Sequence, residues 1–174
     1  PNAANFAVRG AGAALPRMIL ARAGDGWVVA ERGELALKKK HQIGNFADFC
    51  NDCGNCDVFC PEDGGPYLIK PRFFSRLDDY RARAPENGFH LAADGVIYAR
   101  LSGVEYTLSG EGPVRLTGPG VDVRFEPADP AASLQGKAPD LLDLTPYEIL
   151  RWYREAVTAP EAINFVADRL AAQA

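Results

Sequence analysis

Four cysteines within one short segment constrain this chain more than any other feature of its sequence. They are Cys50, Cys53, Cys56 and Cys60, and the 174 residues contain no other cysteine. A secreted domain spreads its cysteines along the chain, so that disulfides tie distant segments together. Cysteines crowded into one segment instead indicate a local binding site for a metal ion or a metal cluster.

The spacing of the cysteines is that of the bacterial ferredoxin motif, Cys-x2-Cys-x2-Cys-x3-Cys-Pro, which ends here at Pro61. Such a motif holds [4Fe-4S] clusters through cysteine thiolates. Small or turn-forming residues between the cysteines, such as Asn51 and Gly54, let the backbone curl and point N–H groups at the sulfides. The four cysteines are therefore the predicted cofactor-binding and metal-binding residues, and no catalytic residue is predicted.

Zinc is the alternative metal, because Cys-x2-Cys pairs also bind zinc. Structural zinc sites usually bring two cysteine pairs together from separated knuckles, whereas all four cysteines lie in one loop here. Disulfides among the four are disfavoured in a cytosolic setting. The sequence thus favours an iron–sulfur site over a structural metal site.

The motif requires more ligands than these residues supply. In two-cluster ferredoxins the first three cysteines of the run bind one cluster and the fourth binds the other. Cys50, Cys53 and Cys56 then need a fourth ligand, and Cys60 needs a second cluster. Because residues 1–8 resemble the segment that follows the last cysteine of such a run, we expect a cysteine directly before Pro1 in a longer parent protein.

Charge and composition argue against two classes of partner. Nineteen Lys and Arg against 23 Asp and Glu give a net charge of −4, and the one basic run is Lys38, Lys39 and Lys40, so no nucleic-acid partner is expected. No stretch approaches the roughly 18 apolar residues that a membrane span needs. The first residues resemble neither a signal peptide nor a transit peptide, and a cytoplasmic protein is predicted.

Turn signals and apolar periodicity divide the chain into four predicted units. Residues 1–84 form a ferredoxin-like iron–sulfur half-domain with an inserted hairpin, whose turn is Gly24-Asp25-Gly26. Residues 85–126 alternate apolar and polar residues between glycine-containing turns, which predicts an antiparallel β-meander. Residues 127–139, with three prolines, are the predicted linker, and residues 140–174 are the fourth unit.

Two capping signals predict helices in this fourth unit. Thr145-Pro146-Tyr147-Glu148 has the threonine, proline and glutamate of a capping box, and Thr158-Ala159-Pro160-Glu161 repeats the signal. We expect helices over about residues 146–157 and 160–172, joined as a helical hairpin. The predicted fold class is α+β: a ferredoxin-type iron–sulfur loop segment, a small antiparallel β-meander and a C-terminal helical hairpin.

One stretch of the sequence resembles a known family. The cysteine run, with Gly64-Gly65-Pro66-Tyr67 and Lys70-Pro71-Arg72-Phe73-Phe74 after it, is similar to the C-terminal iron–sulfur region of the selenate reductase subunit family. These are large flavoproteins similar to the glutamate synthase small subunit and to the electron-input half of dihydropyrimidine dehydrogenase. The resemblance is specific over about residues 38–75, and it implies an NAD(P)H-oxidising, FAD-containing parent enzyme with paired [4Fe-4S] clusters.

Besides a fragment of the enzyme's substrate-handling region, two functions are compatible with these observations. In the first, the chain is an electron-transfer module that relays electrons between an upstream NAD(P)H- and FAD-binding oxidoreductase domain and a partner reductase or dehydrogenase, without being catalytic alone. Phe73 and Phe74 would then pack over the cluster and exclude water. In the alternative, the metal loop is structural, and the chain is an interaction domain that docks subunits of an oxidoreductase complex.

Overall fold

The computed structural model describes residues 4–9, 14–36, 42–56, 58 and 70–173. Strands predominate in these ranges. In chain order they are β1 (Asn5–Val8), β2 (Ala14–Ala23), β3 (Gly26–Ala36), β4 (Gln42–Phe46), β5 (Arg72–Phe74), β6 (Gly88–Leu91), β7 (Ile97–Leu101), β8 (Val104–Ser109), β9 (Val114–Gly118), β10 (Val121–Phe125), β11 (Gln135–Lys137) and β12 (Leu141–Asp143). The helices are the 3-10 turn η1 (Ala47–Phe49), α2 (Leu77–Ala82), α3 (Pro130–Ser133), α4 (Thr145–Thr158) and α5 (Phe165–Ala171).

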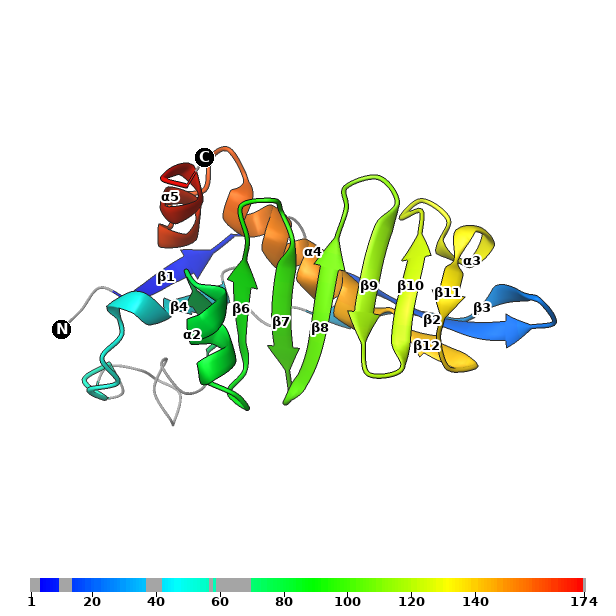
Figure 1. The fold of residues 1–174 in the computed structure, drawn as a ribbon, viewed down its shortest axis with the longest axis horizontal. Coiled ribbons are helices and arrows are strands. Elements are labelled where there is room, and N and C mark those ends of the chain that lie inside the picture. The colour runs from blue at the N-terminus through cyan, green and yellow to red at the C-terminus, as the bar shows by residue number, and fades with distance from the viewer. Residues whose placement is uncertain (1–3, 10–13, 37–41, 57, 59–69, 174) are drawn as a thin grey trace.

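These strands form two sheets, as Figure 1 shows. The larger sheet has nine strands in the order β1-β4-β5-β6-β7-β8-β9-β10-β11, and the smaller has three in the order β12-β2-β3. The pairs β4–β5 and β5–β6 are parallel, whereas the other pairs are antiparallel. The larger sheet is therefore mixed, and its parallel pairs lie beside the segment that leads into the cysteines.

Tight turns connect β6 through β10. Between β7 and β8, Ser102 and Gly103 both have positive φ, at 51° and 79°. Two positive φ values in a two-residue loop are typical of the type I′ turn, whose twist matches that of the flanking strands. The expected hairpin around Gly24-Asp25-Gly26 is present, since β2 and β3 pair from Ala23↔Gly26 to Ala14↔Ala36.

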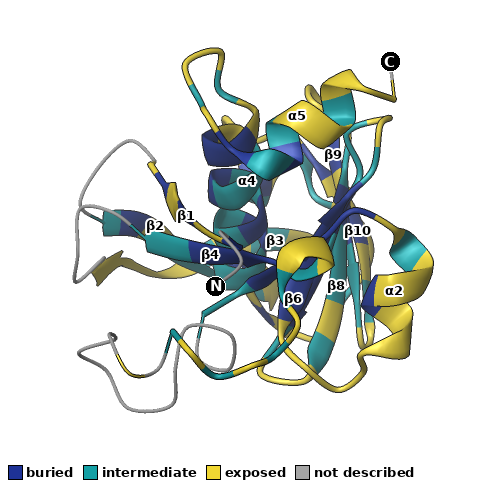
Figure 2. Cartoon of the chain, turned by 90° about the vertical axis from the view of Figure 1, so that its left-hand side faces the viewer, coloured by how far each residue is buried: buried dark blue, intermediate teal, exposed yellow. Residues whose placement is uncertain are grey.

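One buried apolar cluster joins the two sheets and the C-terminal helices. Helix α4 runs along the larger sheet and contacts β1, β2, β7 and β8. Buried residues concentrate in α4 and in the strands around it (Figure 2). The cluster includes residues far apart in the sequence, such as Phe6, Leu20, Leu108 and Leu150. Both sheets thus share a core centred on α4.

The predicted fold class is wrong. The chain is mostly β, with a nine-stranded mixed sheet, and is not a ferredoxin-type iron–sulfur segment followed by a helical hairpin. The strands expected in residues 85–126 are β6 to β10, but they are only the middle of this sheet, because β4 and β5 extend it at one end. Those two strands are short and carry no turn signal, so alternation alone does not reveal them.

The C-terminal helices also differ from the expected hairpin. Helix α4 covers the larger sheet, and α5 begins at Phe165, where the Asn164 side chain accepts a hydrogen bond from the Ala167 N–H at 2.9 Å. The second capping signal, at Thr158, therefore does not start a helix. Within residues 127–139, α3 and β11 form, and β11 pairs with β10. The boundaries of the four predicted units stay a prediction.

Candidate functional site

The cysteine loop, defined here as residues 50–56, follows β4 and η1. Cys50 and Cys56 are partly buried and Cys53 is exposed. The Cys50 N–H donates to the Ala47 carbonyl at 3.1 Å, which closes the turn of η1. The fourth predicted ligand, Cys60, lies outside the described residues. The structure therefore describes three of the four predicted ligands.

The backbone of the cysteine loop turns sharply between successive cysteines. Asp52 has a φ of 53° and Gly54 a φ of 73°. Glycine adopts this left-handed region freely, and aspartate is among the few other residues that tolerate it. The loop is thus folded back at the two positions where its sequence best permits it.

Four charged side chains hold the loop against the sheet. Asp52 Oδ1 lies 3.1 Å from Arg72 Nη2, and Asp52 Oδ2 lies 2.9 Å from Arg83 Nη2. Glu86 closes the ring, at 3.3 Å from Arg72 Nη1 and 3.2 Å from Arg83 Nη1. We call these four residues the Asp52 clamp. It links the loop to β5 and to the segment after α2.

Burial is uneven within the Asp52 clamp, because Arg72 is buried whereas Asp52, Arg83 and Glu86 are partly exposed. The Arg72 side chain is only 5 % exposed. Cys50 Sγ donates to Asp52 Oδ1 at 3.4 Å, so the first cysteine also contacts the clamp. Burial acts to raise the pKa of Asp52, but the hydrogen bonds from Arg83 and Cys50 and the charge of Arg72 outweigh it and lower that pKa. Asp52 is therefore an anion at neutral pH.

Aromatic rings cover the segment that leads into Cys50. The Phe49 ring centroid lies 5.1 Å from that of Phe46 and 4.9 Å from that of Phe165. Phe165 is the first residue of α5, so this cluster packs the C-terminal helix against η1. On the same segment, the Asp48 carboxylate accepts hydrogen bonds from the backbone N–H and the hydroxyl of Ser75. Both contacts fix the entry to the cysteine loop.

The two phenylalanines expected to cover a cluster lie elsewhere. Phe73 is buried and stacks on Phe89, with ring centroids 5.3 Å apart. Phe74 is also buried, 6.0 Å from the ring of Tyr80. These ring contacts are with buried residues of the sheet and of α2, and not with the cysteine loop. They therefore act first as core residues.

Sequence reasoning missed most of the residues that surround the loop. Arg72 belongs to the motif singled out above, but its ionic contact with Asp52 was not expected. Arg83, Glu86 and Phe165 were not considered, since each is far from the cysteines in sequence and only the tertiary fold brings it close. The basic run Lys38–Lys40 lies outside the described residues.

The described residues suit an iron–sulfur cluster in their donor chemistry. Cys50, Cys53 and Cys56 are free thiols, and thiolates are the ligands that such clusters use. Among the described residues, however, no three His, Cys, Asp or Glu side chains form a group arranged to hold a metal ion. The donor set therefore fits a cluster, while the three thiols are not gathered around one centre.

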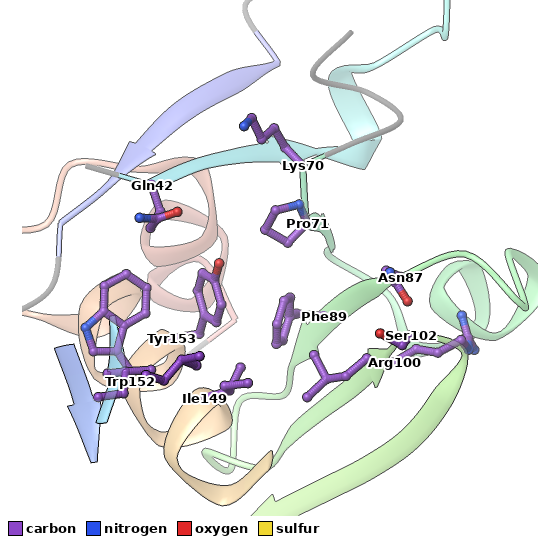
Figure 3. Close-up of a pocket in the computed structure, with 13 residues that line it drawn as sticks. Gln42, Lys70, Pro71, Asn87, Phe89, Arg100, Ser102, Ile149, Trp152 and Tyr153 are labelled. Atoms are coloured by element: carbon purple, nitrogen blue, oxygen red, sulfur yellow. The ribbon is translucent and has the colours of Figure 1, made fainter. Parts of the chain in front are cut away.

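A cavity is lined in part by Lys70 and Pro71, in the segment that enters β5. Its volume is about 350 Å³, within the range of small-molecule sites. Figure 3 shows Phe89, Ile149 and Tyr153 around its apolar part, with Gln42 and Lys70 near its rim. Burial raises the pKa of Tyr153 to about 12. Since Lys70 lies two residues before Arg72, the cavity and the Asp52 clamp share one short segment.

No helix in the described part of the chain has the length and apolar character to cross a membrane. No protein-family model matches the chain, and no solved structure matches it either.

Two curated proteins match part of the chain. They are named "Putative oxidoreductase YgfK", one from Escherichia coli strain K12 and one from Escherichia coli O157:H7. Each is 38 % identical over 73 residues, which are 42 % of this chain and 7 % of the relative. The chain thus spans a small fraction of these relatives. The similarity is consistent with an oxidoreductase-related region and does not show a specific family.

Proposed function

We propose that this chain is an electron-transfer region of an NAD(P)H-dependent flavoprotein oxidoreductase. Cys50, Cys53 and Cys56 would be ligands of one [4Fe-4S] cluster, and Cys60 would be a ligand of a second cluster. The observation that carries the proposal is the spacing of these four cysteines, which is typical of clusters and uncommon in structural zinc sites. The partial similarity to proteins named as oxidoreductases supports it.

In this proposal the cluster would supply one-electron transfer, and the chain would bind the cluster and form its environment. The Asp52 clamp restrains the loop between Cys50 and Cys53. The rings of Phe46, Phe49 and Phe165 pack together beside the segment before Cys50 and would limit its contact with water. These residues bind and shield, and none of them is proposed to make or break a covalent bond.

The electron source and the acceptor would lie outside this chain. FAD and NAD(P)H would bind in upstream domains, and a partner oxidoreductase would accept the electrons. A cytoplasmic location suits the proposal, because a reducing compartment keeps the four thiols available as ligands. In the alternative function the metal loop is purely structural, and the same experiment separates the two.

Metal and sulfide analysis tests the proposal. The protein is purified without oxygen, both at its full natural length and as residues 1–174, and iron, zinc and acid-labile sulfide are measured. We expect iron and sulfide in about equal amounts. Cys56→Ser should reduce both, while the thermal unfolding of the metal-free variant stays that of the metal-free parent chain. Stoichiometric zinc without sulfide would overturn electron transfer and favour the structural alternative.

A further inference from the structure

Asp52 is held by arginines from two separate parts of the fold. Arg72 belongs to β5, and Arg83 follows α2. Both contact the same carboxylate, which lies between the first two predicted ligands, Cys50 and Cys53. The backbone of Asp52 is left-handed, a conformation that costs free energy unless its surroundings hold it. The clamp supplies such a restraint.

The Asp52 clamp is also balanced in charge. Two guanidinium groups, on Arg72 and Arg83, face two carboxylates, on Asp52 and Glu86. The Arg72 side chain is almost fully buried and pairs with both carboxylates, so its charge depends on them for compensation. Removing one charged group therefore leaves a net charge beside Cys50, of a sign that depends on the group removed.

We propose that Asp52 and Arg83 are positioning residues that fix the cysteine loop and, through their opposite charges, set the reduction potential of a cluster held there. This inference rests on the function proposed above. Reduction adds one electron to the cluster and requires no proton from these residues, so the negative charge of the site increases. A nearby positive charge favours that step and a nearby negative charge opposes it.

The two ends of the ion pair therefore make opposite predictions. Asp52→Asn keeps the size of the side chain and tolerates positive φ, but it leaves both arginines undercompensated, so the reduction potential should rise. Arg83→Gln leaves a carboxylate undercompensated, so the potential should fall. Arg83→Lys keeps the positive charge, so its reduction potential should stay close to that of the unaltered protein. Arg83 is 43 % exposed, which makes these variants tolerable for folding.

The measurement is a dithionite titration of the oxygen-free protein, followed by visible absorbance and electron paramagnetic resonance. The matched control is Arg115→Gln, which removes an arginine from an exposed ion pair with Asp122 at 2.8 Å. That pair joins β9 to β10, well away from the cysteine loop in Figure 1. The control should leave the potential unchanged.

Hydrogen exchange of the metal-free protein measures the positioning role separately. Each of the two variants removes two of the four ion pairs of the clamp. Amides of residues 47–56 should therefore exchange about two- to five-fold faster in both Asp52→Asn and Arg83→Gln. Arg115→Gln should not change them. The exchange rates thus change in the same direction in the two variants, whereas their reduction potentials shift in opposite directions.

The outcomes separate this inference from the proposed function. Opposite potential shifts with faster loop exchange in both variants support it. Shifts of the same sign, or no shift, in a protein that holds iron and sulfide would overturn it and leave the electron-transfer function standing. Absence of iron and sulfide from the parent protein would instead refute the proposed function itself, and the effect on potential with it.

Discussion

Replacing Phe73 by alanine tests whether this residue belongs to the core or to the surroundings of the cysteines. Phe73 is 1 % exposed, and its ring lies 5.4 Å from that of Phe6 and 5.8 Å from that of Tyr153. Gly44 packs so closely that an added Cβ would lie 2.9 Å from atoms of the Phe6 and Phe73 rings. The rings are therefore closely packed in this part of the core.

The expected loss follows from this packing. A buried phenylalanine truncated to alanine costs about 3–5 kcal/mol, and ring contacts with several neighbours favour the upper part of that range. Phe49→Ala is the matched control, because the Phe49 residue is 48 % exposed. That variant gives up about half of the burial, so we expect a loss of about 1–2 kcal/mol.

Urea unfolding of the metal-free protein, followed by circular dichroism, measures both variants. With a slope of about 2 kcal/mol per molar urea, Phe73→Ala should lower the midpoint by about 2 M and Phe49→Ala by less than about 1 M. Equal effects of the two variants would refute the core assignment. A Phe73→Ala defect that appears only after metal loading would restore the interpretation of Phe73 as cover for a cluster.

Three further predictions concern other parts of the fold. Burial raises the pKa of Tyr80 and of Tyr153 to about 12, and the stability that these two residues contribute is complete below pH of about 10 and is lost as pH rises toward 12. Burial also raises the pKa of Tyr147, so ultraviolet titration should show more than two late-ionising tyrosines, with Tyr80 and Tyr153 among them. Gly136→Ala should lower the thermal midpoint, because at φ of 112° its Cβ would lie 2.2 Å from a carbonyl oxygen of β10. Asn164→Ala should cost about 1–2 kcal/mol in urea unfolding, because its side chain caps α5 and donates to a carbonyl of α4.

How much of the fold could be predicted depended on whether the signal was local. The hairpin of β2 and β3 and the strands β6 to β10 follow from turn residues and alternation, which act over a few positions. The pairing of β5 with β4 and β6 involves three residues and distant partners, so no local pattern marks it. Because of this pairing, the strands expected to form a small meander are part of a nine-stranded sheet.

The candidate site shows the same division. The cysteine spacing identifies the predicted ligands directly, because cluster chemistry fixes the residue type and the intervals. The Asp52 clamp has no such signature. Arginine and glutamate are common on surfaces, and only the parallel strands and α2 bring Arg83 and Glu86 to the loop. The burial of Arg72 distinguishes it from an ordinary surface arginine, and burial requires the tertiary structure.

The pairing of β12 with β2 affects how the chain folds as it is synthesised. Leu20 is fully buried beside Leu142, yet β2 leaves the ribosome long before β12 does. Contacts between distant segments form slowly, whereas β6 to β10 pair in the sheet only with strands that are adjacent to them in sequence. The apolar face of the hairpin of β2 and β3 is therefore exposed until β12 is synthesised, while β6 to β10 pair with one another. A nascent chain that stops before residue 141 should bind chaperones or aggregate through that face.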